Sequence, residues 1–245
     1  MESSEIKKKE QIFIPKTTIK RLLTDVKNII KNPLDDNGIH YIHDETDILK
    51  GYALIIGPDD TLYEGGCYLF EFNFPSDYPF SPPLLKFKTN NGFTRFNPNL
   101  YKNSKVCVSI LNTWSGEQWS SCQTISTILL VLVSLLNNTP LLNEPGVTKY
   151  HRDYNNYNKI IQYENLNFAI KEFIKIESYP KGFKPLHKIY IEYLKKDNRF
   201  SKILEKIDKY KIEENTEEIA VGIYGMNILI NYKKLFAEFK KIKLE

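Results

Sequence analysis

The sequence predicts an α+β protein in which two helices accompany four short strands and further helices follow. Three observations carry this expectation: helical periodicity over Thr17–Lys31, period-two alternation between Gly38 and Asn90, and an almost wholly apolar stretch at Thr124–Leu136. Apolar residues recur every 3 to 4 positions in a packed helix and every second position in a half-buried strand. The combination indicates an antiparallel sheet with one helix before it and one packed behind it.

The first predicted helix, Thr17–Lys31, is amphipathic. Placed 100° apart, six apolar residues fall in one arc: Ile19, Leu22, Leu23, Val26, Ile29 and Ile30. Four lysines line up beside that arc: Lys16, Lys20, Lys27 and Lys31. We expect the arc to pack, while the lysines form a basic stripe that is either a solvated face or a docking surface for an acidic protein.

Four strands are predicted from the alternating segments. They are Gly38–His43, Leu49–Ile56, Cys67–Phe74 and Leu84–Lys88. The connectors between them are short and rich in Gly, Pro and Asp, which favours an antiparallel meander. In the third strand Cys67 falls on a face that becomes polar, so we interpret it as a small packing residue.

A long irregular segment, Asn90–Gln118, separates the last strand from the apolar helix and holds Cys107 near its middle. Ordered loops of this length inside a compact domain are usually functional. Ser120 with Gln123 has the spacing of a capping box that would open helix Thr124–Leu136. Because this helix is apolar nearly all round, we expect it to be buried, with Cys122 packed at its start.

The chain is predicted to divide into a flexible arm at residues 1–16, a core at 17–150 and a helical extension at 151–245 packed against the core. The composition shifts to Tyr, Lys, Ile and Asn beyond Val147. The helices expected there are Tyr157–Ser178, Leu186–Lys196, Lys202–Lys211 and Asn231–Leu244.

Composition narrows the class of protein. A net charge of +4 from 34 basic and 30 acidic residues gives no strong attraction to nucleic acid or membrane, so we expect neither as a partner. No stretch reaches the roughly 20 apolar residues of a membrane span, and no secretory signal precedes the first helix, so we expect an intracellular, cytoplasmic protein, with a nuclear location left open. Three cysteines cannot all pair, and neither they nor His40 and His43 have the spacing of a metal site, so we assign no metal.

The segment around Cys107 resembles the active-site segment of ubiquitin-conjugating enzymes. Their motif is His-Pro-Asn with the catalytic cysteine eight residues after the Asn, and Asn99 and Cys107 keep that spacing. Upstream, Tyr63–Gly66 and Phe74–Pro83 are similar to the sheet signature of the family, and Trp119 before a capped apolar helix is similar to its next segment. The matches follow one another in order over roughly Thr17–Val147, which makes chance an improbable source.

One residue departs from the family motif, since Asn97 stands where most members have His. That His is mainly structural in the family, so its loss does not by itself remove activity. Leu111–Gly116 and Asn143–Gly146, with the helical extension, are similar to the subfamily of ubiquitin-conjugating enzyme Z, although Asn112 replaces a Gly of its pattern.

The resemblance implies that Cys107 accepts ubiquitin or a ubiquitin-like modifier as a thioester and passes it to a lysine, with no cofactor. Cys107 then needs to be exposed and partly ionised near the ordinary thiol pKa of about 8.5. Asn99 is implied as a donor to the developing oxyanion, with bracing of the loop as an equal and compatible role. Asn143 and Glu144 stand where the family orients and desolvates the attacking lysine, although Glu144 could equally be an ordinary turn carboxylate.

Partner surfaces are implied in the same way. The basic stripe of Lys16, Lys20, Lys27 and Lys31 is similar to the surface that binds the activating enzyme. Phe80, Ser120 and Ser121 are similar to the surface that ligases bind, although Phe80 could instead belong to the core. The partners implied are therefore a ubiquitin-like modifier, its activating enzyme, a ligase and protein substrates that offer a lysine.

Three alternatives stay open. A combined conjugating enzyme and ligase would recruit substrate through the extension. A catalytically silent binding module would keep the fold but would typically lack the cysteine. A cysteine protease would need an imidazole folded beside Cys107; the histidines available are His40, His43, His151 and His187.

Overall fold

The computed structural model describes residues 13–213 and 216–244 of the chain. It begins with helix α1 (Lys16–Lys31), so Lys16 is already helical; the predicted arm up to residue 12 lies outside the described residues. Pro15 precedes the first helical turn, where its missing N–H costs nothing. The backbone N–H of Asn32 bonds the carbonyl of Asn28, and the helix stops at Asn32-Pro33 as expected.

A four-stranded antiparallel sheet follows, with its strands in the order of the sequence. The strands are β1 (Ile39–His43), β2 (Lys50–Ile56), β3 (Cys67–Asn73) and β4 (Leu84–Phe87). Each pairs with the next in simple register, for example Tyr41 with Ala53 and Glu71 with Lys86. The predicted meander is therefore confirmed, with one end of each strand shifted by one residue.

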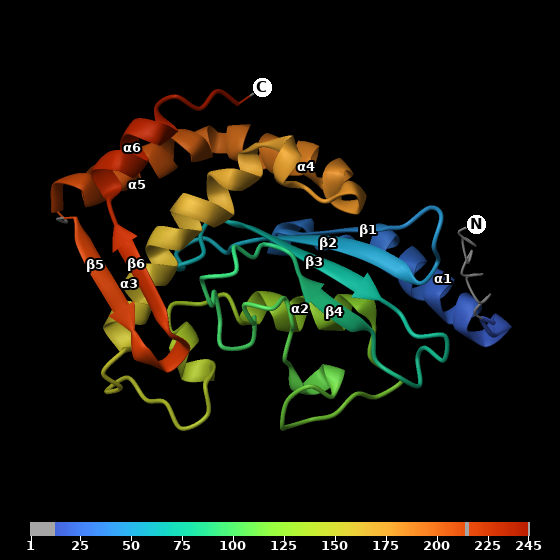
Figure 1. The fold of residues 1–245 in the computed structure, drawn as a ribbon. Helices are drawn as coiled ribbons and strands as arrows, with labels where there is room; N and C mark the ends of the chain where they lie inside the picture. The colour runs from blue at the N-terminus through green and yellow to red at the C-terminus, as the bar shows by residue number, and fades with distance from the viewer. Residues whose placement is uncertain (1–12, 214–215, 245) are drawn as a thin grey trace, which may run out of the picture.

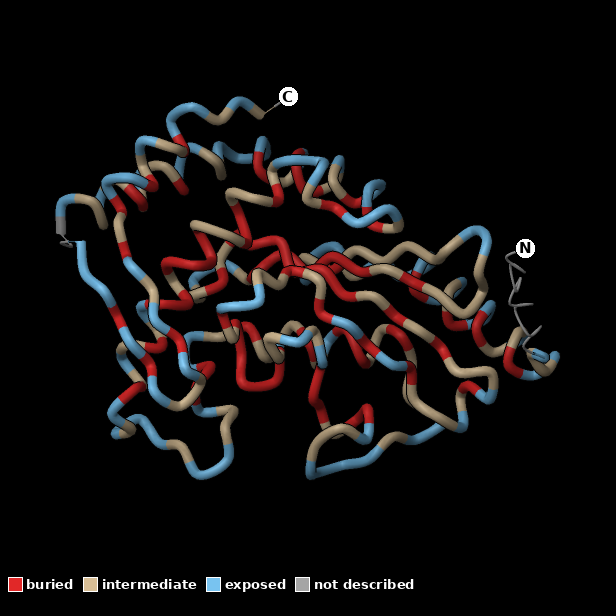
Figure 2. The backbone as a smooth tube through the Cα atoms, viewed as in Figure 1, coloured by how far each residue is buried: buried red, intermediate tan, exposed pale blue. Residues whose placement is uncertain are grey.

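The sheet is the middle layer of the molecule, and Figure 1 shows α2 (Ile125–Ser134) below it and α4 (Lys184–Lys195) above it. Figure 2 shows the densest burial along the strands between these layers. On the upper face Phe183 stacks edge-on against Tyr52 of β2, at 4.9 Å between ring centroids. On this face of β3, Cys67 and Leu69 are fully buried, whereas Glu71 and Asn73 at the far end of the strand are half-buried.

Cys67 lies under this upper layer and is fully buried, as its interpretation as a packing residue requires. Its sulfur is 3.3 Å from the hydroxyl of Tyr179 in the extension. Burial raises the pKa of the Cys67 thiol well above its ordinary range. Cys67 is therefore held as a neutral, inert thiol.

Helix α2 begins at Ile125, and its cap is Thr124, whose hydroxyl accepts a hydrogen bond from the backbone N–H of Thr127. The predicted capping box at Ser120 and Gln123 is wrong, because the Gln123 N–H bonds the Ser120 carbonyl in a turn before the helix. Cys122 consequently stands in that turn and is exposed, which corrects its predicted packing.

The extension is mostly helical, as predicted, but it contains a hairpin that the prediction missed. Its elements are α3 (Tyr154–Glu164) with a π-helical continuation (Asn165–Ile170), α4, α5 (Arg199–Glu213), β5 (Glu217–Val221), β6 (Met226–Ile230) and α6 (Tyr232–Phe239). A signal existed, because Ile219 and Val221 and then Met226 and Ile230 alternate inward around a Gly-rich turn. The final predicted helix is also shorter than expected, since Asn231 is its cap and Phe239 its last residue.

Candidate active site

Cys107 is clasped by Asn99 through two hydrogen bonds. The backbone N–H of Cys107 donates to the Asn99 carbonyl at 2.9 Å, and the Asn99 amide Nδ2 donates to the Cys107 carbonyl at 2.6 Å. The two residues are eight apart in sequence, so this pairing closes the loop at the predicted spacing. In this structure Asn99 therefore braces the loop through its side-chain amide.

The sulfur of Cys107 is covered, which corrects the expectation that it is exposed. Cys107 is only 2% exposed, and its Sγ donates to the Thr113 carbonyl at 2.9 Å. The backbone reverses at Asn112, whose φ of +56° lies in the left-handed region that Asn tolerates. The segment Asn112–Gln118, which we call the cover, thereby folds back over the thiol.

Thr113 also fixes the cover through its side chain. Its hydroxyl accepts a hydrogen bond from the Val108 N–H at 3.0 Å and faces the carbonyls of Val106 and Val108 at 3.2 and 3.1 Å. The side chain of Asn112 accepts a hydrogen bond from the Trp119 N–H at 2.7 Å. These contacts are local and involve few side chains. The segment from Ser115 to Gln118, which makes up the rest of the cover, is exposed.

Asn97, the residue that departs from the family motif, is buried, and its side chain is hydrogen-bonded to separate parts of the chain. Its Nδ2 donates to the Leu135 carbonyl at the end of α2 at 2.9 Å, and its Oδ1 accepts from the Asn99 N–H at 3.0 Å. The amide of Asn143 reaches the same Oδ1 at 3.4 Å. Asn97 thus performs the structural role expected at this position and links Asn143 to the loop that holds Cys107.

Glu144, the carboxylate expected to orient the attacking lysine, is half-buried and already hydrogen-bonded. Its Oε2 accepts a hydrogen bond from the hydroxyl of Tyr224 at 2.6 Å. Tyr224 lies 80 residues further along the chain, in the turn between β5 and β6. Neither Tyr224 nor Thr113 was singled out from the sequence, and a tyrosine that far away carries no local signal that could have found it.

The histidines lie away from the thiol in their own hydrogen bonds. His43 bonds Tyr41 and the Ile48 carbonyl, and His40 pairs with Asp35. His187 bonds the Ile174 carbonyl, and His151 accepts from the Asp153 N–H. Because the partner of the Cys107 sulfur is a backbone carbonyl, the geometry gives no support to a Cys–His protease pair. Residues 13–213 and 216–244 contain no cluster of three metal-ligating side chains, and no helix among them could cross a membrane.

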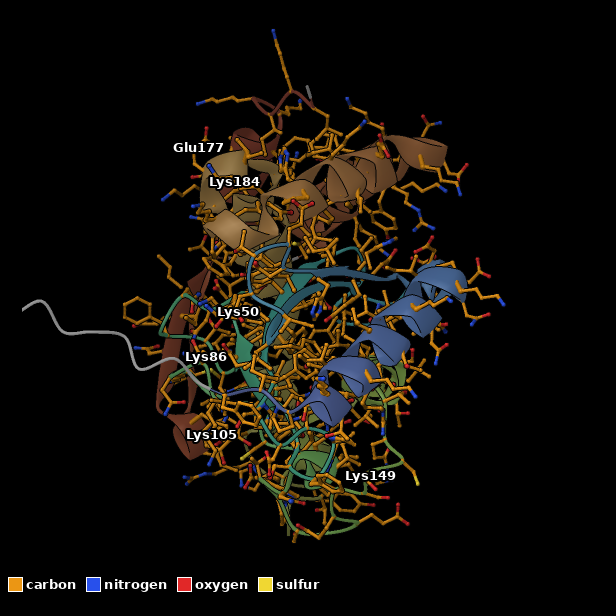
Figure 3. The ribbon with its side chains drawn as sticks, turned by 90° about the vertical axis from the view of Figure 1, so that its right-hand side faces the viewer. Lys50, Lys86, Lys105, Lys149, Glu177 and Lys184 are labelled. Atoms are coloured by element: carbon orange, nitrogen blue, oxygen red, sulfur yellow. The ribbon has the colours of Figure 1, made fainter. Side chains whose placement is uncertain are left out.

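The predicted basic stripe lies on an open face of α1. Lys16, Lys20, Lys27 and Lys31 are all exposed. The predicted apolar arc is split, however, because Leu22 and Ile29 are buried while Leu23 and Ile30 are 56% and 68% exposed. The packed side instead includes Asp25, whose carboxylate accepts from the Tyr78 hydroxyl at 2.6 Å and pairs with Arg21. Lysines and apolar side chains thus share one accessible surface, and Figure 3 shows α1 at the front of the molecule.

Phe80, Ser120 and Ser121 are all exposed, and the structure brings them into one neighbourhood. Phe80 is 77% exposed, so its alternative interpretation as a core residue is wrong. The indole of Trp119 donates to the Pro79 carbonyl at 2.8 Å. Phe80 follows Pro79 and Ser120 follows Trp119, so these two residues lie on adjacent loops. Arg21 of α1 donates to the Ser121 carbonyl and ties this surface to α1.

Comparison with known proteins places this site in a family. The family model described as "Ubiquitin-conjugating enzyme" matches residues 21–165, which include the sheet, Asn99, Cys107 and α2. The chain belongs to the ubiquitin-conjugating enzyme family.

Among its relatives are proteins named ubiquitin-conjugating enzyme E2 Z. The chain is 43% identical over 158 residues to the one from Xenopus tropicalis, which covers 63% of this chain and 50% of that protein. It is also 43% identical over 158 residues to the one from Homo sapiens, of which 44% is covered. The chain therefore spans about half the length of these relatives.

A third relative has a second activity in its name. The chain is 53% identical over 108 residues to the human protein "Dual E2 ubiquitin-conjugating enzyme/E3 ubiquitin-protein ligase BIRC6", across 41% of this chain and 2% of that protein. The family match ends at residue 165, where the π-helical continuation of α3 begins, so the division of the chain near residue 150 stays a prediction.

Proposed function

We propose that this chain accepts ubiquitin or a ubiquitin-like modifier from an activating enzyme as a thioester on Cys107 and transfers it to a lysine. The observation that carries the proposal is the clasp between Cys107 and Asn99 inside the family-matched region. In the first step the Cys107 thiol loses its proton and the thiolate attacks the carbonyl of the incoming thioester. A new C–S bond forms, the C–S bond to the activating enzyme breaks, and the cysteine of that enzyme leaves as a thiolate that takes up a proton. The thioester supplies the free energy, so no strong base beside Cys107 is required.

The cover must move for this step to occur. The Cys107 S–H now donates to the Thr113 carbonyl and the residue is only 2% exposed, so the sulfur cannot meet an incoming thioester until the cover opens. The cover is exposed along most of its length and is fixed by few side-chain hydrogen bonds, so its opening requires no change in the sheet or in α2. We propose that docking of the activating enzyme displaces it.

In the second step a neutral lysine amine attacks the thioester, a C–N bond forms, and the C–S bond breaks with return of a proton to the Cys107 sulfur. Negative charge builds on the carbonyl oxygen, and the free N–H of the Asn99 amide is the donor we assign to it. Asn143, whose amide donates to the Oδ1 of Asn97, and the neighbouring Glu144 would orient and desolvate the amine.

The partner surfaces are proposed from exposure and charge. Lys16, Lys20, Lys27 and Lys31, together with the exposed Leu23, would bind an acidic surface of the activating enzyme. Phe80 with Ser120 and Ser121 would bind a ligase, because an exposed aromatic side chain on a fixed loop is a typical anchor. The pathway depends on ATP through the activating enzyme, and we propose a cytoplasmic location, with a nuclear one as the alternative.

The test is a charging panel of modifiers against activating enzymes, with ATP present. We expect an adduct that excess thiol removes, and Cys107→Ser should convert it into an oxygen ester that survives thiol. Cys67→Ser is the matched control and should still give the thiol-labile adduct. Absence of any adduct with every pair tried would refute the proposal.

In the same assay Lys16→Glu combined with Lys20→Glu should slow charging about tenfold or more, since two favourable charges become unfavourable.

A second candidate, a combined conjugating enzyme and ligase, is favoured by the contact between the extension and Glu144. In that case the chain would modify a substrate without an added ligase, and removing a ligase from the reaction would change nothing. The presence of Cys107 in register with Asn99 argues against a silent binding module.

A further inference from the structure

The β5–β6 hairpin joins the extension to the active-site end of the core. Figure 3 shows Glu177 and Lys184 of the extension at one end of the molecule and Lys105 and Lys149 at the other, with Lys50 and Lys86 between them. Figure 1 shows β5 and β6 running from the level of α5 and α6 down beside α3. The turn at the tip, Gly222–Tyr224, therefore reaches the loops that surround Cys107.

The tip is held by residues of the active-site loop. The Lys102 Nζ donates to the carbonyls of Tyr224 and Gly225 at 2.8 and 3.2 Å. The Arg95 guanidinium lies 3.5 Å from the ring centroid of Tyr101 and 4.7 Å from that of Tyr224. Such stacking desolvates the guanidinium and contributes beyond simple area burial. The position of Tyr224 is thus set by the same loop that carries Asn97 and Asn99.

The turn itself is anchored from the other side. The backbone N–H of Ile223 donates to the Asp153 carboxylate at 2.9 Å, and Asp153 is buried. Gly225 follows with a φ of +55°, a left-handed conformation that glycine adopts without steric cost. With the backbone fixed on both sides, the Tyr224 hydroxyl has a defined position relative to the carboxylate of Glu144.

The Tyr224 hydroxyl is a dependable donor. Burial raises its pKa first, and the hydrogen bond to Glu144 and the charge of that carboxylate raise it further. The phenol therefore stays protonated at physiological pH and donates its hydrogen to Oε2 of Glu144 at 2.6 Å. Hydrogen bonds of this length to an ionised acceptor are among the stronger ones in proteins.

We infer that Tyr224 of the extension is a positioning residue that fixes the Glu144 carboxylate for the lysine that attacks the Cys107 thioester. The inference rests on the proposed function. Without the phenol the Glu144 side chain would sample several rotamers, and the attacking amine would meet a correctly oriented carboxylate only part of the time. The extension would thereby contribute to the second chemical step while leaving the first to the core.

The experiment uses the full chain, charged on Cys107 and freed from activating enzyme and ATP, and follows discharge to free lysine under single-turnover conditions. Rates are normalised to the charged fraction. Tyr224→Phe keeps the ring over Arg95 and removes only the hydroxyl. We expect discharge at saturating lysine to slow about tenfold, the size typical for loss of a hydrogen bond to a charged group.

Two comparisons separate positioning from a general structural effect. Tyr190→Phe removes another phenol hydrogen bond of the extension, to the Gly65 carbonyl at 2.8 Å, without touching Glu144, and should discharge at the wild-type rate. If Tyr224 acts through Glu144, Glu144→Ala combined with Tyr224→Phe should discharge no more slowly than Glu144→Ala alone.

Three results would overturn the inference: an unchanged or faster discharge by Tyr224→Phe, equal slowing by Tyr190→Phe, or additive losses in the double variant. Each leaves the proposed function intact, because the thioester has formed. Failure of the wild-type chain to charge would instead remove the proposed function and this inference with it.

Discussion

Cys67 and Cys107 are buried to nearly the same degree, 0% and 2% exposed, but by different kinds of structure. Cys67 lies between β3 and the packed layer of the extension, where Tyr179 and Phe183 are themselves buried. Cys107 lies beneath the cover, whose outer residues are exposed and whose anchors are a few hydrogen bonds made by Asn112 and Thr113. Burial alone therefore does not set the reactivity of these two thiols; we expect it to depend on how much structure must move to expose each sulfur.

The largest expected effect is the difference in alkylation rate between the two thiols in the native protein. Uncovering Cys107 needs only local opening, whereas uncovering Cys67 needs the extension to leave the sheet. A difference of about 3 kcal/mol in opening free energy corresponds to roughly 100-fold in rate. Mass spectrometry after timed iodoacetamide exposure should find Cys122 modified first, Cys107 next and Cys67 last. Equal alkylation rates for Cys67 and Cys107 would show that the two thiols do not differ in the structure that must open to expose them.

The next effect comes from weakening the layer over Cys67. Phe183→Ala removes a fully buried ring packed on Tyr52, and such truncations typically cost about 3–5 kcal/mol. We expect a fall in melting temperature of about 10 °C and faster alkylation of Cys67, with that of Cys107 nearly unchanged. An exposed aromatic residue provides the control, since Phe93→Ala should change neither quantity. Faster alkylation of both Cys67 and Cys107 in Phe183→Ala would mean that the extension layer over Cys67 and the cover over Cys107 open as one unit.

The smallest effect comes from loosening the cover. Thr113→Val removes the hydroxyl that accepts from the Val108 N–H, and the loss of about 1 kcal/mol predicts alkylation of Cys107 about fivefold faster. Thr113→Ser retains the hydroxyl and should behave as wild type. Alkylation of Cys67 should not respond to either change. If Thr113→Val leaves the rate for Cys107 unaltered, the hydroxyl does not hold the cover closed.

The core was largely predictable because its signals are local. Alternation located the four strands, whose register then follows from short connectors, and the spacing of Asn99 and Cys107 located the clasp between them. The predicted capping box at Ser120 failed because Ser and Thr caps compete over short distances, and Thr124 was equally suited to the role. The missed hairpin alternated correctly, and its five-residue strands are no shorter than β1 or β4, so the same alternation could have located it.

Local sequence was enough to predict the α+β core and the helical character of the extension and to propose the cysteine that carries a thioester, because periodicity and motif spacing are properties of neighbouring residues. Tertiary structure alone decided that the Cys107 sulfur is covered by the Thr113 carbonyl and that the Glu144 carboxylate is bonded to a tyrosine 80 residues away. The physical reason is that exposure and long-range hydrogen bonds depend on which surfaces meet after the chain has folded, and local pattern carries no record of that choice.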